Sequence, residues 1–254
     1  MNRRAARRVL AIACLAPVTA TADDETEINA PLPNRSYVRF EPSYLRGDGT
    51  STAELESRGI VVYRGGWLPG VDAERLMSGL AVDWTLDRTV DARGAKMGLG
   101  DLGLTEVTGV ELSWGAAGGG LAMSAPTATE SAFGRGRFQL GPAGFVQVTA
   151  LPALTLSVLV EDYFAPAAAS TGVEALRTRI EPGFVVTFPH DWLLSSDGEI
   201  DLDWLAHDYT VPVNVEIGCT LGSHVTVQAG PEVEVIGAQR GALKLDVRID
   251  LIDP

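Results

Sequence analysis

The stretch LKLDVRIDL, residues 243–251, alternates apolar and charged side chains without a break. The same alternation occurs in VNVEIGCT at 213–220 and in VTVQAGPEVEV at 225–235. Because successive side chains of a β-strand point to opposite faces, each run predicts a strand with one apolar and one polar face. Runs of about 9–11 residues in this pattern, separated by short turns, are typical of membrane-spanning β-barrels. A soluble antiparallel sheet with one face in water gives the same alternation, so the pattern alone leaves both folds open.

The first 22 residues have the composition of a secretory signal peptide. Four arginines among the first eight residues precede a short apolar run at 9–18, and ATA at 20–22 is a typical cleavage site. The apolar run is too short to span a bilayer. An alternative is lipid attachment at Cys14, because residues 11–14 loosely resemble a lipobox. Export favours an outer-membrane barrel, with a soluble periplasmic β-sheet protein as the alternative.

The rest of the chain has the length of one barrel domain. Residues 1–22 carry four of the 20 Lys and Arg and none of the 33 Asp and Glu, so their removal changes the net charge from −13 to −17. This acidic excess excludes nucleic acid as an expected partner, because nucleic-acid binding requires basic patches. We expect a flexible acidic leader at 23–34 and a β-barrel domain at 35–254. Cys219 is the only cysteine after residue 22, so no intrachain disulfide is expected.

The alternation extends toward the N-terminus and predicts an all-β fold. We expect an antiparallel, up-and-down transmembrane β-barrel of about 10–12 strands. Gly, Pro and polar residues predict loops or turns at 46–52, 87–98, 115–120 and 125–136. In addition to the three strands described above, the predicted strands lie at 35–45, 56–66, 74–85, 101–114, 137–150, 154–164, 174–188 and 191–204, with another beginning at 121.

Aromatic residues lie near the ends of the predicted strands. In a barrel they would form the interfacial girdles, where one side of each ring contacts lipid and the other contacts water. In a soluble sheet the same side chains would belong to the core or its rim. The predicted girdle residues are Tyr63, Trp67, Trp84, Trp114, Tyr163, Trp192, Trp204 and Tyr209.

A series of short motifs resembles one family of outer-membrane proteins. That family is often labelled "transporter" or, by a misnomer, "neuromedin U", and is related to the meta-pathway phenol-degradation outer-membrane proteins. The resemblance covers about residues 36–254 and implies an exported barrel in passive transport, with no assigned substrate and no agreed catalytic residues. The motifs that carry it are GLGDL (98–102), PTAT (126–129), FGRG (133–136), LGP (140–142), WLLSS (192–196), DW (203–204) and TVP (210–212).

Two of these motifs also have a direct physical interpretation. The glycines of GLGD at 98–101 suit a tight turn or a close backbone approach at the start of a strand. The small residues from PTAT to LGP suit a hairpin whose tip packs closely or folds inward. The alternative is that both motifs reflect turn chemistry alone.

Charged residues on the polar faces of the predicted strands would line the lumen of a barrel. Their acidic excess would favour cations over anions in a pore. Alternatively, they would form a closed network of salt bridges that fills the lumen and lets nothing pass. The predicted lumen-lining residues are Glu111, Glu161, Arg179, Glu181, Asp201, Asp203, Glu216, Glu232, Glu234, Lys244, Asp246, Arg248 and Asp250.

No catalytic, cofactor or metal site is predicted. The three histidines, His190, His207 and His224, lack the spacing of metal ligands. The sequence has no G-x-S-x-G elbow, no P-loop and no dinucleotide fingerprint in a βαβ context. The remaining enzymatic alternative is a lipid hydrolase in which Ser195 or Ser196 would use His190 as its base.

These features together predict an outer-membrane channel or passive transporter for small solutes, with a net acidic lumen. Outer-membrane lipid and small solutes are the expected partners. A closed structural or binding barrel without transport is the alternative. The solute and the oligomeric state are not predicted.

Overall fold

The computed structural model describes residues 35–253 except 48–49, 65–75, 92–93, 167–172 and 238–240. The predicted signal peptide, the predicted leader and Trp67 lie outside the described residues. No helix in the described ranges is long and apolar enough to cross a membrane.

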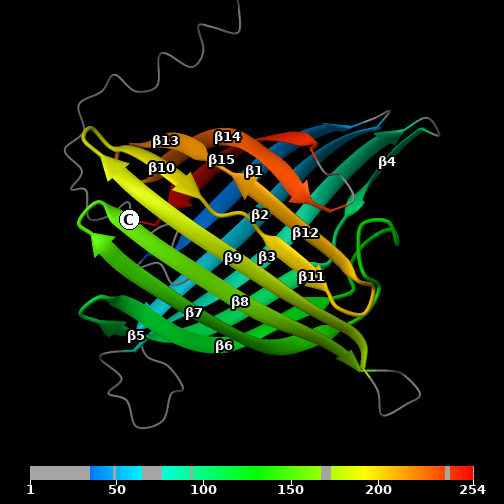
Figure 1. Ribbon diagram of the computed structural model, residues 1–254, viewed down its shortest axis with the longest axis horizontal. Helices are drawn as coiled ribbons and strands as arrows, with labels where there is room; N and C mark the ends of the chain where they lie inside the picture. The colour runs from blue at the N-terminus through cyan, green and yellow to red at the C-terminus, as the bar shows by residue number, and fades with distance from the viewer. Residues whose placement is uncertain are drawn as a thin grey trace, which may run out of the picture.

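All regular structure in these ranges is β-strand (Figure 1). The strands are β1 (Tyr37–Gly47), β2 (Thr50–Arg64), β3 (Leu76–Asp91), β4 (Gly94–Leu99), β5 (Leu102–Leu112), β6 (Gly115–Ala125), β7 (Gln139–Leu151), β8 (Leu154–Pro166), β9 (Val173–Phe188), β10 (Trp192–Ser196), β11 (Ile200–Asp203), β12 (Asp208–Asn214), β13 (Glu216–Leu221), β14 (Val225–Ile236) and β15 (Leu243–Ile252).

The sheet closes on itself through its first and last strands. β1 pairs antiparallel with β15, from Tyr37 opposite Ile252 to Arg46 opposite Leu243. The other pairings are also antiparallel. Once the interrupted strands are joined, they link strands that are consecutive along the chain. Within the described ranges β4 continues into β5, β10 into β11 and β12 into β13, so the fifteen segments form twelve barrel strands. The predicted antiparallel up-and-down barrel is therefore confirmed.

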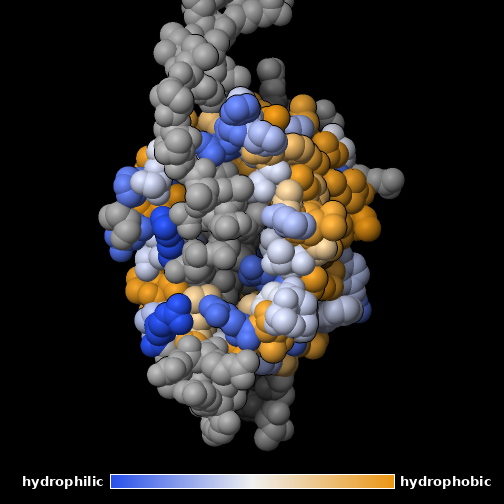
Figure 2. All heavy atoms as spheres, turned by 90° about the vertical axis from the view of Figure 1, so that its left-hand side faces the viewer, coloured by the Kyte–Doolittle hydropathy of each residue, from blue (hydrophilic) through white to orange (hydrophobic). Residues whose placement is uncertain are grey.

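The two faces of the closed sheet differ as the alternation predicts. On β15, Leu243 and Leu245 face outward and are 59% and 56% exposed, whereas Asp246 and Arg248 are buried. Ile217 on β13 is 58% exposed, next to the buried Glu216. Figure 2 views the barrel from the end that carries the C-terminus and shows hydrophobic residues along much of the outer rim. The apolar faces thus point outward, opposite to the arrangement in a soluble barrel with a hydrophobic core.

Three predicted loops are partly wrong. Within the predicted loop 87–98, residues 87–91 form the end of β3 and 94–98 form most of β4, and the two strands pair from Leu86 opposite Leu99 to Asp91 opposite Gly94. Residues 115–120 belong to β6, and in 46–52 both β1 and β2 extend into the predicted loop. The predictions relied on glycine and polar content, but a barrel pairs each strand on both sides, and this pairing overrides weak local preferences.

Glycines in β6 allow close packing against neighbouring backbone. A Cβ atom at Gly120 would overlap the Glu106 carbonyl of β5, and one at Gly118 would overlap the Thr108 carbonyl. Gly59 on β2, by contrast, has open space where its Cβ would lie. Gly118 and Gly120 are therefore required by sheet packing and not by a turn.

We expect Gly120→Val to destabilise the barrel by about 3 kcal/mol or more, because the side chain would collide with backbone that cannot rotate away. The measurement is urea unfolding of the detergent-folded protein, together with heat-modifiable migration on a gel. Gly59→Val is the matched control and should keep the wild-type midpoint. Equal midpoints for the two variants would contradict this account of β6.

Candidate functional site: the charged barrel interior

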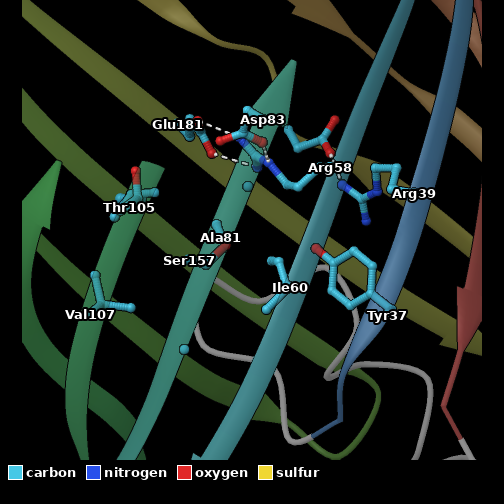
Figure 3. A pocket seen from close by; sticks show the side chains of 14 residues that line it. Tyr37, Arg39, Arg58, Ile60, Ala81, Asp83, Thr105, Val107, Ser157 and Glu181 are labelled. Atoms are coloured by element: carbon cyan, nitrogen blue, oxygen red, sulfur yellow. Dashed lines mark hydrogen bonds and ion pairs between the residues drawn. The ribbon is translucent and has the colours of Figure 1, made fainter. Parts of the chain in front are cut away.

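An ion-paired group connects opposite walls of the barrel. The Arg58 guanidinium on β2 lies 2.5 Å from the Asp83 carboxylate on β3 and 3.3 Å from the Glu181 carboxylate on β9. In the strand order, five barrel strands separate β2 from β9 in either direction. The Arg58–Glu181 pair therefore crosses the interior along a diameter, as Figure 3 shows.

Asp197 is the centre of a second group. Its carboxylate lies 2.5 Å from Arg248 of β15 and 3.7 Å from Arg39 of β1. Arg39 also pairs with Asp250 at 2.7 Å. These side chains are largely buried, so the charges are neutralised mainly by one another.

A break in the strand places Asp197 in this position. β10 ends at Ser196 and β11 begins at Ile200, so Asp197 lies outside the regular ladder. The Asn214 side chain replaces the ladder there: its Oδ1 accepts a hydrogen bond from the Asp197 N–H at 3.0 Å, and its Nδ2 donates to Asp197 Oδ1 at 2.9 Å. Pro212 of the adjacent strand has no N–H to offer the ladder.

The loop between β6 and β7 folds over the β4–β5 junction. The Asp101 carboxylate accepts hydrogen bonds from the backbone N–H groups of Ala128 at 3.1 Å and Arg135 at 2.6 Å. A Cβ at Gly98 would overlap Phe133 of this loop. The GLGD and PTAT motifs are therefore in contact, and the glycine permits the close approach.

Arg135 connects this loop to another part of the wall. Its guanidinium lies 2.9 Å from Asp201 and 3.5 Å from Asp203, both on β11. Arg177 of β9 shares Asp201. The loop is thus held by Asp101 at the β4–β5 junction and, through the Arg135 side chain, by Asp201 and Asp203 of β11.

Cavities lie within the described part of the barrel. One, of 90 Å³, is lined by Arg39, Arg58, Glu181, Asp197 and Arg248. Two others differ in size and lining. The larger, of 220 Å³, is bounded by Gly134 and Arg135 of the loop and by Glu54 and Glu56 of β2. The smaller, of 60 Å³, is the cavity in Figure 3, where Tyr37, Ile60 and Val107 form an apolar part beside the Arg58 ion pairs. The interior therefore has a charged compartment near the loop and a tighter, partly apolar one.

Eleven of the thirteen predicted lumen-lining residues belong to the interior ion pairs. Glu111 is exposed at the end of β5, and Glu234 is half-buried near the end of β14. The eleven are Glu161, Arg179, Glu181, Asp201, Asp203, Glu216, Glu232, Lys244, Asp246, Arg248 and Asp250.

The prediction missed several ion-paired residues of the same interior. Some were visible in the sequence, because Arg39, Glu41 and Asp83 lie on polar faces of predicted strands. Asp197 was hidden because the segment 191–204 has no unbroken alternation. The missed residues are Arg39, Glu41, Arg58, Asp83, Arg135, Arg177, Asp197 and Glu199.

One predicted girdle residue is wrong. Tyr163 is only 3% exposed, and its hydroxyl donates a hydrogen bond to Glu161 at 2.9 Å inside the barrel. Its position on β8 has the parity of the inner face, and the Arg177 guanidinium lies 5.5 Å from its ring centroid. Trp84, Trp114 and Trp204 are 42–44% exposed, as a girdle position requires.

In the hydrolase alternative, Ser195 or Ser196 would be the nucleophile, but both hydroxyls donate hydrogen bonds to side-chain amides. Ser195 is 1% exposed and donates to Gln228 Oε1 at 2.6 Å. Ser196 donates to Asn214 Oδ1 at 3.1 Å. His190 lies in the turn after β9 with a positive φ of 67°. In this geometry neither serine is arranged as a nucleophile beside a histidine base.

Solved structures share this fold at low sequence identity. An outer membrane channel from Pseudomonas putida F1 has a TM-score of 0.63 and 13% identity, with 88% of this chain and 97% of that chain covered. The NanC porin has a TM-score of 0.51 and 9% identity, covering 84% and 98%. The KdgM porin in complex with disordered oligogalacturonate has a TM-score of 0.52 and 9% identity, covering 85% and 98%. No family model and no curated protein sequence matches the chain.

The fold is that of outer-membrane barrels. At these identities the likeness concerns the fold alone, so the relation to the "transporter" family stays a prediction.

We expect Asp197→Ala to lower the free energy of unfolding by about 3–5 kcal/mol, because the buried Arg39 and Arg248 would lose a shared partner. Urea unfolding in detergent measures this. Asp208→Ala, at an exposed position on β12, is the control and should change stability by less than about 0.5 kcal/mol. A loss at Asp197 no larger than at Asp208 would rule out its central role.

Proposed function

We propose that this chain spans the outer membrane and acts as a channel or passive transporter for small solutes. The outward apolar face suits lipid, and the inward charged face suits water and polar solutes. The fold shared with outer-membrane channels supports this proposal. The observation that carries it is the charged interior, because burying charge costs stability that an interior filled with apolar side chains would not lose.

The path through the barrel is proposed to be narrow. The Arg58–Glu181 pair and the Asp197 group cross the interior and line the 60 Å³ and 90 Å³ cavities. We infer that these pairs form the constriction. Small solutes would have to pass beside them or to displace them.

Purified protein in planar bilayers should give small single-channel currents. In the double variant Arg58→Ala/Glu181→Ala we expect the conductance to rise on the order of twofold, because both halves of the crossing pair are removed together. Arg88→Ala, on the outer face of β3, is the control and should conduct as the wild type does. Unchanged conductance in the double variant would place the constriction elsewhere.

We expect K⁺ to be preferred over Cl⁻. The interior ion pairs join seven cationic side chains to twelve carboxylates, and Glu54 and Glu56 add to the acidic side of the larger cavity. An acidic pore attracts cations. The zero-current potential in a KCl gradient measures the preference.

Glu54→Gln/Glu56→Gln should reduce that preference. Glu106→Gln, on the outer face of β5, should leave it unchanged. A preference for anions in the wild type would refute the acidic-lumen proposal.

The second candidate is a closed barrel without transport. The observation in its favour is the same set of crossing ion pairs, which fill much of the interior. Absence of current from both the wild type and the Arg58→Ala/Glu181→Ala variant would favour this closed barrel over a channel.

A further inference from the structure

The 220 Å³ cavity beneath the β6–β7 loop lies between an acidic wall and a basic wall. Glu54 and Glu56 of β2 line one side, and Arg177 of β9 and Arg135 of the loop line the cavity as well. β2 and β9 stand opposite each other in the barrel. The volume is many times the about 10–15 Å³ that one water molecule needs. The cavity therefore has room for a small solute between groups of opposite charge.

The acidic wall has no ion pair of its own. Within the described residues, neither Glu54 nor Glu56 has a salt bridge or a side-chain hydrogen bond. The cations whose charge acts on them are Lys244 and Arg58, and both are engaged in ion pairs with other carboxylates. Carboxylates in a partly closed cavity without such partners favour a solute that brings a positive charge.

The arginines that line the cavity have donors left over. Arg135 contacts Asp201 and Asp203 through its two Nη atoms. Arg177 contacts Asp201 and Glu199 through Nε and Nη2. Because a guanidinium has five N–H groups, each arginine can donate to a further acceptor. A solute carboxylate suits this wall, because guanidinium groups match its geometry and the acidic interior disfavours an anion of higher charge.

A buried glutamine without partners lies beside the same cavity. Gln139 of β7 is 0% exposed, and within the described part of the chain neither its Oε1 nor its Nε2 has a hydrogen-bond partner. Its position has the parity of the inner face, directly opposite Ser124, which lines the cavity. A buried amide without partners is costly, so Gln139 points to a ligand that supplies both a donor and an acceptor.

We propose that this cavity binds a small zwitterion, such as an amino acid. The ammonium group would lie at Glu54 and Glu56, the carboxylate at Arg135 and Arg177, and both would be within the reach of an amide such as that of Gln139. A simple cation would leave the arginine wall unused, and a simple anion would face the unpaired carboxylates. This inference rests on the proposed channel function and names the class of solute that the channel takes.

The test is binding of L-serine to the full-length protein folded in detergent, measured by saturation-transfer NMR. Ethanolamine lacks the carboxylate of L-serine, and 3-hydroxypropanoate lacks its ammonium group, so the three probes separate the two walls. We expect L-serine to bind at least tenfold more tightly than either analogue. Equal affinities for the three probes would overturn the proposal, as would the absence of L-serine binding.

Gln139→Leu removes the amide and leaves the charge of the cavity unchanged. We expect it to weaken L-serine binding at least fivefold and to keep the urea midpoint at or above that of the wild type, because an amide without partners adds no stability. Gln147→Leu is the matched control. Gln147 is also a buried glutamine of β7 with an unpartnered Oε1, but it pairs opposite Ala116, near the other end of the strand. Equal L-serine affinities of the two variants would contradict the site.

The two walls can be tested one at a time. Arg135→Gln, at the half-buried loop position, should weaken the binding of L-serine at least tenfold and leave that of ethanolamine unchanged. Glu54→Gln/Glu56→Gln should weaken the binding of both. Equal effects of Arg135→Gln on the two probes would refute the assigned orientation.

The K⁺ current in planar bilayers separates failure of this inference from failure of the channel. Current without L-serine binding would overturn the zwitterion site and leave the channel standing. L-serine binding without current would support the site and show that the barrel binds the solute without conducting.

Discussion

Closure of the sheet between β1 and β15 is the constraint on which the rest of the structure depends. Once the last strand pairs with the first, no edge remains, and every side chain faces either outward or into a confined interior. The charged side chains inside can then be neutralised mainly by one another. The crossing pairs from Arg58 to Glu181 and from Asp197 to Arg248 follow from this confinement.

Regular strand pairing is interrupted at two positions whose acidic side chains make contacts with other strands or loops. The break between β10 and β11 releases Asp197 from the ladder, and Asn214 takes over the lost backbone contacts. The junction of β4 and β5 releases Asp101, which anchors the β6–β7 loop. In both places an acidic side chain at a break organises groups from other strands, as is common for bulges and interruptions beside functional sites.

The interior combines two demands that oppose each other. A path for solutes needs free space and mobile water, whereas stability favours complete pairing of buried charge. The larger cavity beneath the β6–β7 loop has space and an acidic lining, and the region around Arg58 and Asp197 is tightly paired. In the proposed channel, selectivity would lie in the first region and the constriction in the second.

The alternation along the chain, together with the predicted export signal, predicted the antiparallel barrel, and it placed eleven of the charged residues that pair inside it. It could do so because the side-chain period of a strand is two, whatever the partner strand is. Register was beyond the sequence, so the meeting of Arg58 with Glu181 across the barrel could not be predicted. Asp197 was missed because it lies in an irregular segment. Tyr163 has the parity of Glu161, so the alternation itself could have placed it inside the barrel. Local pattern thus determined the two faces of the strands, and tertiary structure decided which charges share a site, because closing the sheet brings together charges as distant in sequence as Arg39 and Asp250, 211 positions apart.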